Sequence, residues 1–340
     1  MDRSRSGLGK VVIVNTADEG GGAERMSMAT LDGFAALGTD TWLLVGQKRT
    51  DHPRVLPFHT SPFIDYRPYA GARRQAALAR RRRVARWLGL EDFAHPYSRR
   101  ILDLTGGPPD LVLCHNLHGG YFDLRALAPL SHRVPVVLRV FDSWLLTGHC
   151  AQPLGCPRWQ SGCGRCPDLA RPPSVRRDAT RLNWWRKRRI VRDARLFVTA
   201  ESEWMLDRAR RSLLAPAVAA WKLIPGGVDL DTFAPGPRAG ARRELGLGPE
   251  ADVLLFVANL GSENPLKDFP TVRGALDELA RRPAVRPVEL IVVGADGPEE
   301  TVAPGIRIRR AGYVRSPERL ARFYRAADVH VHAAIEEPFG

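Results

Sequence analysis

Short apolar runs recur through the first half of the chain and alternate with longer segments of mixed polarity. Lys10–Asn15 is apolar and β-branched, Ala23–Leu37 has helical composition and ends at Gly38, and Thr41–Val45 is a second apolar run. A glycine just past a helical segment is a common C-cap, so this order predicts two parallel strands joined by a helix. Three further runs have the continuous apolar character of strands buried on both faces: Leu111–Cys114, Val134–Val140 and Leu196–Thr199.

A second series of the same kind begins after Ile224. The stretch Asp229–Gly240 is rich in proline and glycine and predicts a linker. Ser316 and Pro317 suit the N-cap and first turn of a helix that runs to Ala326. The other predicted elements are a helix at Phe269–Arg281 and strands at Asp252–Val257, Val288–Val293, Ile306–Ala311 and Asp328–Ala333.

The two series together predict an α/β protein of two Rossmann-like domains, residues 1–221 and 222–340. The length of 340 residues is that of two ordinary domains. Two such domains in tandem would have a cleft between them, and open α/β sheets bind ligands outside the carboxyl ends of their strands. The loops that follow the strands are therefore expected to carry the functional residues.

Arginine gives the chain a formal charge of +14 and concentrates in two stretches, Arg73–Arg86 and Arg176–Arg195, the second containing Trp184 and Trp185. A positive field of this kind attracts anionic lipid, nucleic acid or phosphorylated substrates. The alternative is a general preference for arginine on solvated helix faces, with no partner involved. An anionic membrane surface is the favoured partner and nucleic acid is not expected, because no nucleic-acid-binding module accompanies the charge.

The apolar runs are too short to span a bilayer, and the charged N-terminus is not followed by the apolar core of a signal peptide. The sequence therefore predicts a cytoplasmic protein, peripheral at the inner face of the membrane.

Three polar or glycine-rich segments follow predicted strands. Gly20–Gly22 lies between a strand and a helix, where glycines allow close approach to a phosphate. Its spacing is not that of a dinucleotide site, and a turn without function has the same pattern.

Lys267 precedes the helix at Phe269 and could neutralise a departing diphosphate, or it is a surface lysine. Glu336 and Glu337 follow the last strand, where they could hold sugar hydroxyls or be exposed in a turn.

His115 and His118 follow the strand Leu111–Cys114. Three residues apart, they could contact one ligand or supply a base, and two structural histidines are the alternative.

Four cysteines form the sharpest local pattern, with spacing C-x5-C-x6-C-x2-C among glycines and prolines: Cys150, Cys156, Cys163 and Cys166. Four thiolates suit a tetrahedral structural zinc site, although the first interval is wider than usual. Disulfides are a rival that a cytosolic setting disfavours, and free thiols are another. Cys114 is isolated and is expected to pack in its strand.

These segments together resemble the family 4 glycosyltransferases, which are retaining enzymes of the GT-B fold. The resemblance covers nearly the whole chain. The cysteine segment, about residues 142–170, and His115-Asn-Leu-His-Gly119 are similar to a subgroup that includes colanic-acid-type and other exopolysaccharide transferases. The other matching segments are residues 21–24, 223–233, 292–298, 324–329 and 337–340.

The resemblance implies a role for each matching residue. Lys267 would neutralise the donor diphosphate, and Glu337 would hold hydroxyls of the transferred sugar as the first glutamate of an E-x7-E pair. No metal would take part in the chemistry, and cationic groups and helix dipoles would stabilise the leaving nucleotide. Backbone near the donor or acceptor would come from the remaining matches: Gly21, Gly22, Gly294, Gly297, Gly312, Tyr313 and Val314.

The chain departs from the family pattern at several positions. Asn259 stands where an arginine often precedes the diphosphate lysine, Phe141 where a histidine usually contacts the donor sugar, and Gly226 where an asparagine is usual. The second glutamate of the pair would lie beyond Gly340, so the second domain is expected to be incomplete and the 340-residue form inactive.

The sequence therefore predicts a hexosyl-type transferase that moves a sugar from a nucleotide donor to a cell-surface polysaccharide or lipid-linked glycan. Two rivals remain. One is a basic, zinc-stabilised nucleic-acid-binding protein, which has no need of the glycine and glutamate motifs at strand ends. The other is a non-catalytic binder of sugar nucleotides, suggested by Phe141 and Asn259.

Overall fold

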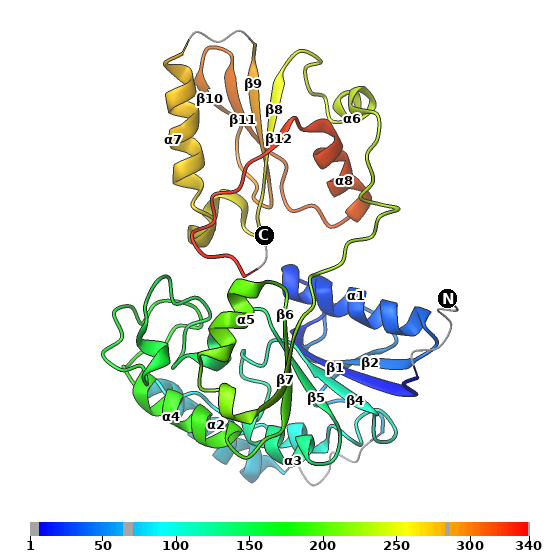
Figure 1. Ribbon diagram of the computed structural model, residues 1–340. Helices are drawn as coiled ribbons and strands as arrows, with labels where there is room; N and C mark the ends of the chain where they lie inside the picture. Colours follow the sequence, from blue (N-terminus) through cyan, green and yellow to red (C-terminus); the bar gives the residue numbers. More distant parts are fainter. Residues whose placement is uncertain (1–6, 64–70, 283–285, 339–340) are drawn as a thin grey trace. The chain divides into compact units, whose positions relative to one another are not determined.

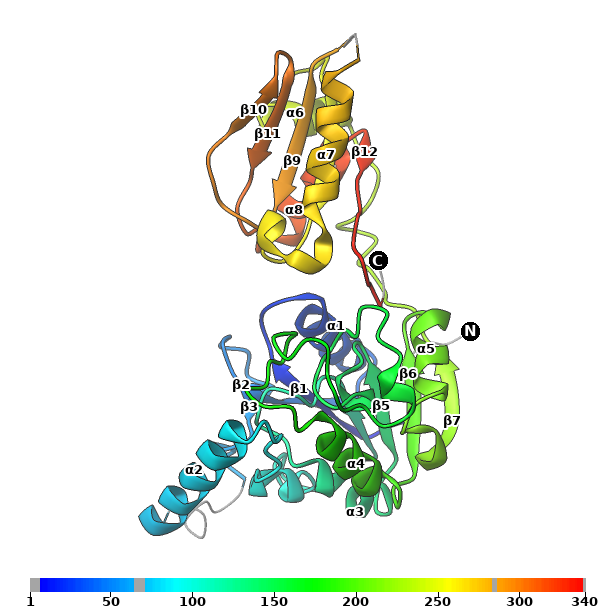
Figure 2. The same cartoon turned by 90° about the vertical axis from the view of Figure 1, so that its left-hand side faces the viewer.

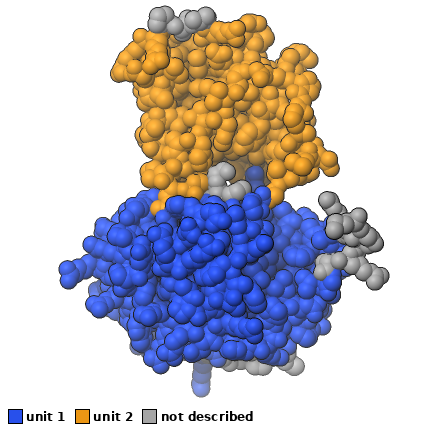
Figure 3. Space-filling model, in the orientation of Figure 1, with its two compact units in different colours: residues 1–226, 338–340 blue, residues 227–337 orange. Residues whose placement is uncertain are grey.

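The computed structural model describes residues 7–63, 71–282 and 286–338. The chain divides into two compact units, residues 1–226 with 338–340 and residues 227–337, which Figure 3 colours separately. The division lies after the last strand of the first unit, β7 (Val218–Leu223), whereas the boundary expected after residue 221 would cut this strand. None of the helices in the described ranges is long and apolar enough to cross a membrane.

The first unit is built on a seven-stranded sheet in the order β3-β2-β1-β4-β5-β6-β7 (Figure 1). Every neighbouring pair is parallel. The strands before β7 are β1 (Lys10–Ala17), β2 (Asp40–Gln47), β3 (Val55–Pro57), β4 (Leu111–Cys114), β5 (Val136–Val140) and β6 (Leu196–Ala200).

Alternate residues of β1 bury opposite faces of this sheet. Val11 and Ile13 pack in one core cluster with Leu31 of α1, and Val12 and Val14 pack in the other cluster. Burial of each such side chain contributes about 1.5–3 kcal/mol, which explains the continuous apolar character of the strand. Figure 2 shows helices on both sides of the sheet: α1 (Gly22–Ala36), α2 (Ala72–Trp87), α3 (Leu127–Ser131), α4 (Thr180–Val191) and α5 (Glu203–Arg210).

The second unit has a five-stranded sheet in the order β10-β11-β9-β8-β12, parallel except for β10. Its strands are β8 (Asp252–Val257), β9 (Val288–Val293), β10 (Glu300–Ala303), β11 (Ile306–Arg310) and β12 (Val329–His330). One face is covered by α7 (Phe269–Ala280) and the other by α6 (Arg238–Glu244) and α8 (Pro317–Ala326), as Figure 1 shows.

The last strand is much shorter than the predicted Asp328–Ala333. Asp328 stands before the strand and accepts hydrogen bonds from the Val253 amide at 2.7 Å and from Arg242 at 2.5 Å. At the far end of this segment, the Ile335 amide donates to the Leu266 carbonyl at 3.1 Å. The Asp328 carboxylate at one end and the Ile335–Leu266 hydrogen bond at the other therefore hold this segment, which pairs with β8 over only two residues.

Three short edge elements were missed in the sequence: β3, β7 and β10. Edge strands are half exposed, so the alternation that identifies a buried strand is weak in them. The predicted linker Asp229–Gly240 is also too long, because α6 begins at Arg238. The α/β fold with two Rossmann-like units is otherwise as predicted.

Candidate functional site

The order of strands in the first sheet reverses between β1 and β4, and open α/β sheets bind ligands at such a switch point. Side chains at the two strand ends lock the loops there together. The Asn116 amide donates to Asn15 Oδ1 at 3.2 Å, and Thr16 Oγ1 donates to the His118 carbonyl at 3.0 Å. The segment that carries both predicted histidines is therefore fixed at the carboxyl edge of the sheet.

His118 is held by a carboxylate from the next strand. Its Nε2 lies 3.0 Å from Asp142 Oδ2, and the other oxygen of Asp142 accepts the Trp144 amide at 2.8 Å. Burial lowers the pKa of His118, but the charge and hydrogen bond of Asp142 outweigh it, so the pKa is raised. His118 is thus a partly exposed, oriented imidazole that carries charge more readily than a free histidine.

His115 has a different environment. It is buried, and its Nδ1 lies 2.8 Å from Ser27 Oγ of α1. Burial and the charge of Arg139 lower its pKa to about 3, so it stays neutral. Its Nε2 is buried with no hydrogen-bond partner in the described structure. The two histidines are therefore brought to one strand end with opposite electrostatic characters.

Phe141 lies beside two polar groups. Its ring contacts the His115 ring edge-on at 5.0 Å, and the Arg139 guanidinium lies 5.5 Å from its centre. Arg139 donates to Glu201 Oε1 at 2.8 Å, and both side chains are nearly buried. The sequence does not predict this ion pair, because Arg139 and Glu201 are far apart in the chain and each lies near the end of an apolar run.

Gly21 and Gly22 stand at the start of α1. The Gly21 amide donates to Glu24 Oε2 at 2.8 Å, which caps the helix. Gly22 has no atom within 4 Å of where a side chain would begin. The backbone at this helix N-terminus thus borders open space at the switch point, where an anionic group is favoured.

The second sheet reverses its order at β8, between β9 and β12. Lys267 and Glu337 meet there in an ion pair, each side chain about one-fifth exposed. Lys267 ends a short 3-10 turn, Pro265–Lys267, directly before α7. The bond between residues 335 and 266 described above brings Glu337 to the lysine. Lys267 and Glu337, each predicted from the sequence for a separate reason, are thus direct partners.

Three glycines allow the neighbouring loops to pack closely. At Gly294, with φ +113°, an added side chain would begin 1.7 Å from the Ala258 carbonyl oxygen. At Gly312, with φ +66°, it would begin 2.4 Å from Asp296, and at Gly297 it would begin 2.7 Å from Arg310. The Gly294 amide also donates to the Gly312 carbonyl at 2.8 Å. The loops after β8, β9 and β11 therefore form one assembly that depends on these glycines.

The other predicted positions of this unit differ in exposure. Val314 is buried and Tyr313 is 43% exposed. Asn259, in place of the family arginine, is exposed, and its carbonyl accepts the Asn264 side chain at 3.0 Å. Without the family arginine at position 259, Lys267 is a cation that the described structure places directly before α7.

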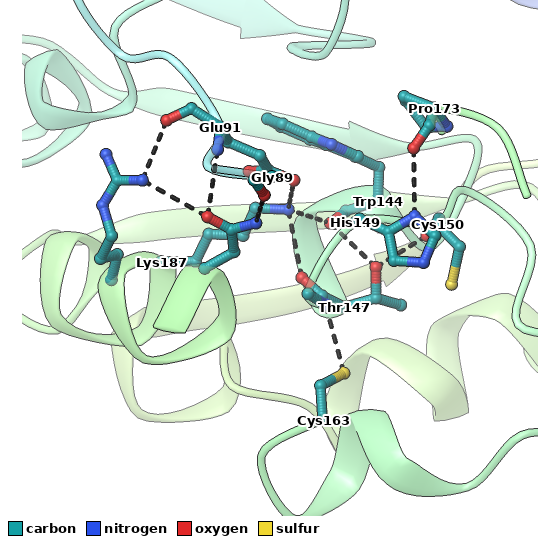
Figure 4. A network of polar contacts seen from close by, with 12 residues as sticks. Gly89, Glu91, Trp144, Thr147, His149, Cys150, Cys163, Pro173 and Lys187 are labelled. Carbon is teal, nitrogen blue, oxygen red and sulfur yellow. Dashed lines mark hydrogen bonds and ion pairs between the residues drawn. The ribbon is translucent and has the colours of Figure 1, made fainter. Parts of the chain in front are cut away.

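Lys187 of α4 is fully buried beneath the turn that follows β5. Its Nζ donates to Glu91 Oε1 at 2.8 Å and to the carbonyls of Trp144 at 2.7 Å and Thr147 at 3.1 Å (Figure 4). Burial is the largest effect on both charges: it lowers the pKa of Lys187 and raises that of Glu91. This lysine fixes the turn that begins with Asp142.

The four clustered cysteines are free thiols, so no disulfide joins them. In the described part of the chain, no group of three or more His, Cys, Asp or Glu side chains is arranged to hold a metal ion. All four cysteines nevertheless line one small cavity. The zinc prediction therefore stays a prediction. Cys114 is buried in β4 as expected.

The two basic stretches form helices α2 and α4. Trp184 is buried and donates from Nε1 to the Trp159 carbonyl at 2.8 Å, so it belongs to the core. Trp185 and Trp87, by contrast, are each half exposed. Arg189 and Arg177 lie over these two rings.

Several proteins of known name are similar to parts of this sequence. Over 129 residues, 35% of this chain and 27% of the relative, it is 40% identical to a D-inositol 3-phosphate glycosyltransferase of Segniliparus rotundus. Over 170 residues, 45% of this chain and 37% of the relative, it is 32% identical to the enzyme of the same name from Acidothermus cellulolyticus. The matched segments thus span well under half of these relatives.

Solved structures match the fold over nearly the whole chain. HepE of Anabaena, in complex with UDP and glucose, aligns with a TM-score of 0.53 at 15% identity, covering 97% of this chain and 76% of that one. WaaG, a glycosyltransferase involved in lipopolysaccharide biosynthesis, aligns with a TM-score of 0.52 at 13% identity, covering 95% and 75%. These likenesses establish the GT-B architecture.

The sequence profile of Glycosyltransferase Family 4 matches residues 20–232, which is more than half of the chain. The matched region runs from the glycine loop before α1 to the end of β7 and beyond it, and so contains both histidines and the cysteine segment. The chain therefore belongs to Glycosyltransferase Family 4.

Proposed function

We propose that this protein is a retaining glycosyltransferase that takes a sugar from a nucleotide-sugar donor. The observation that carries the proposal is the Lys267–Glu337 ion pair at the switch point of the second sheet, beside the glycine-dependent loops after β8, β9 and β11. A cation, a carboxylate and closely packed backbone are the groups that a diphosphate, sugar hydroxyls and a nucleoside require.

The Lys267–Glu337 ion pair would bind both the diphosphate and the sugar hydroxyls, because each side chain would exchange its present partner for a group of the donor. In the absence of donor, the ammonium and the carboxylate neutralise each other. A bound diphosphate would replace Glu337 as the partner of Lys267, and the released carboxylate would accept hydrogen bonds from the sugar. Lys267 would then stabilise the negative charge that grows as the nucleoside diphosphate leaves, together with the N-terminus of α7.

The first unit would hold the acceptor. His118, oriented by Asp142, presents a hydrogen-bonding imidazole at the switch point, and the Gly21–Gly22 backbone borders open space there. We assign the acceptor to the class of lipid-linked or cell-surface glycans. The named relatives act on D-inositol 3-phosphate, so this phosphate is the second acceptor to be tested.

The donor class is supported by HepE, which binds UDP and glucose and shares the fold. Binding of UDP-glucose, GDP-mannose and the free diphosphates, measured by calorimetry, tests the donor site. Lys267→Ala should abolish binding of the diphosphate, whereas Lys222→Ala, at an exposed lysine of the first unit, should leave it intact. Equal binding by both variants would exclude the proposed site.

Transfer itself is tested with lipid-linked glycans and inositol 3-phosphate as acceptors. Proton NMR of the product gives the anomeric configuration, and inversion would contradict the retaining assignment. Donor binding without transfer to any acceptor, by a chain that carries both glutamates of the E-x7-E pair, would favour a non-catalytic binder.

We also propose that an anionic membrane is the surface on which the acceptor is met. Two grooves of about 660 and 920 Å³ share Leu88 and Leu90. Arg80 and Arg81 of α2 line the first groove, and the half-exposed Trp185 lines the second. Trp87, which precedes Leu88, is half exposed as well. Arginine attracts anionic headgroups, and tryptophan favours the interface between water and lipid.

Sedimentation with phosphatidylglycerol and phosphatidylcholine vesicles tests this surface. Reversing Arg80, Arg81 and Arg83 to glutamate should abolish binding to anionic vesicles. Reversing Arg281, Arg282 and Arg286, exposed in the second unit, changes the net charge equally and should have little effect. Equal loss in both variants, or equal binding to neutral vesicles, would contradict a specific surface. Tighter binding to an oligonucleotide than to vesicles would favour nucleic acid.

A further inference from the structure

The loop between β5 and α4 contains four thiols but no helix or strand beyond short 3-10 turns. Cys150, Cys156, Cys163 and Cys166 all line one cavity of about 20 Å³. A volume of this size holds about one water-sized sphere. The remaining lining groups include His149, Trp159 and Thr180.

The backbone around two of these thiols has the tight turns that ligand loops need. Cys163 and Arg165 have φ +54° and +44°, and the intervening Gly164 has φ +86°. Left-handed backbone is unfavourable for residues with a side chain, such as Cys163 and Arg165, whereas glycine adopts it readily. Leu154, between the first two cysteines, is also left-handed with φ +47°, so both halves of the cysteine pattern contain such a turn.

Hydrogen bonds aim at the sulfur atoms. The Gly148 amide donates to Cys163 Sγ at 3.2 Å, and His149 Nε2 lies 3.3 Å from Cys166 Sγ. The Cys166 thiol in turn donates to the Asp168 carbonyl at 3.3 Å. Figure 4 shows His149, Cys150 and Cys163 close to the polar contacts of Lys187.

We propose that Cys150, Cys156, Cys163 and Cys166 close around one structural zinc ion. The thiols already share a cavity and lie on loops without regular structure, so side-chain rotation and small loop shifts would bring the sulfurs into a tetrahedral shell. The ion takes no part in transfer. It stabilises the loop between Asp142 and α4, which has no helix or strand beyond short 3-10 turns.

Metal analysis of the purified chain is the direct test. We expect about one zinc per chain and five thiols that react with a thiol reagent after unfolding in chelator. Each of Cys150→Ser, Cys156→Ser, Cys163→Ser and Cys166→Ser should lower the zinc content strongly. Cys114→Ser, at the buried cysteine outside the cluster, should keep it and serves as the matched control.

Cobalt(II) provides a readout of the ligand set that is independent of activity. Cobalt added to the zinc-free chain should give thiolate charge-transfer bands and the visible bands of tetrahedral coordination. His149→Gln should keep both the zinc and the spectrum, and loss of either would overturn the four-thiol assignment. A zinc-free chain whose melting temperature does not rise with zinc, or one with fewer than five free thiols, would overturn the proposal.

Discussion

His118 Nε2 lies 3.0 Å from Asp142 Oδ2, so the loops after β4 and β5 are joined by a histidine–carboxylate pair at the switch point of the first sheet. The pair forms although burial alone would favour a neutral imidazole. Asp142 therefore decides the charge of His118, and Lys187 holds the turn that carries Asp142.

Asp142→Asn should lower the pKa of His118, measured by NMR titration of the imidazole protons. A raised folded-state pKa stabilises the fold fully below the unfolded value of about 6.5, and this stabilisation is lost as pH rises through the folded pKa. The variant should therefore lose about 1 kcal/mol of unfolding free energy at pH 5.5 and much less at pH 8.5. Asp103→Asn, in the exposed Arg100 pair, is the control. An unchanged His118 pKa would show that Asp142 does not set its charge.

Lys187→Met should destabilise the protein by about 3–5 kcal/mol, because it leaves the Glu91 carboxylate buried without its cation. Glu91→Gln added to this variant should restore part of the loss, since no uncompensated charge then remains. Arg281→Met, which removes an exposed pair with Glu278, should cost under about 1 kcal/mol. Chemical unfolding measures all three. Equal costs for Lys187→Met and the double variant would mean that the carbonyl contacts of Lys187, rather than its charge pair, stabilise the turn.

In a chain that carries both glutamates of the E-x7-E pair, Lys267→Ala should lower turnover at least about 100-fold, a loss of ~3 kcal/mol in transition-state stabilisation. The side chain is partly exposed, so the free energy of unfolding should change by under about 1 kcal/mol. Steady-state kinetics with a nucleotide-sugar donor and denaturant unfolding separate the two effects. Turnover within a few-fold of the parent would remove Lys267 from the mechanism.

Gly294→Ala should cost more than about 3 kcal/mol and weaken donor binding, because the added methyl group meets the Ala258 carbonyl and the backbone has positive φ. Gly274→Ala is the matched control. That glycine lies inside α7 with open space around it, so alanine should stabilise the protein by about 0.5–1 kcal/mol. Thermal unfolding compares the two, and a neutral Gly294→Ala would mean that the loops can separate without cost.

The buried strands could be predicted because their apolar character is local and continuous. Val134–Val140, for example, contains β5 and ends at the same residue. The bounds of the last strand could not be predicted, because its start depends on the contact between Asp328 and Arg242, which are far apart in sequence. β10 pairs only with β11 and has no buried residue, so its sequence carries little strand pattern.

Part of the candidate site could be predicted, because its residues follow strands that can themselves be recognised from their local apolar character. Lys267 and Glu337 each follow a strand, and strand ends meet at one edge of a sheet, but their direct pairing needed the loop bond between residues 335 and 266. Lys187 was missed although it shares the buried stripe of α4 with Trp184 and Val191, a helical spacing that marks it as internal. The signal available in the sequence was that a charged residue, Lys187, stands at a position where this helical spacing predicts an apolar one.

The segment from Asp328 to Glu337 is attached at its two ends by ionic side chains, and between them by the short ladder with β8 and by the bond from the Ile335 amide to the Leu266 carbonyl. A ligand that draws Lys267 away from Glu337 would therefore release the ionic attachment at Glu337 while leaving Asp328 and the Ile335 bond in place. Residues 336 and 337 would absorb the displacement, and β12 would keep its register with β8. The second sheet can thus exchange one ionic partner for another at its carboxyl edge without rearranging its edge strand.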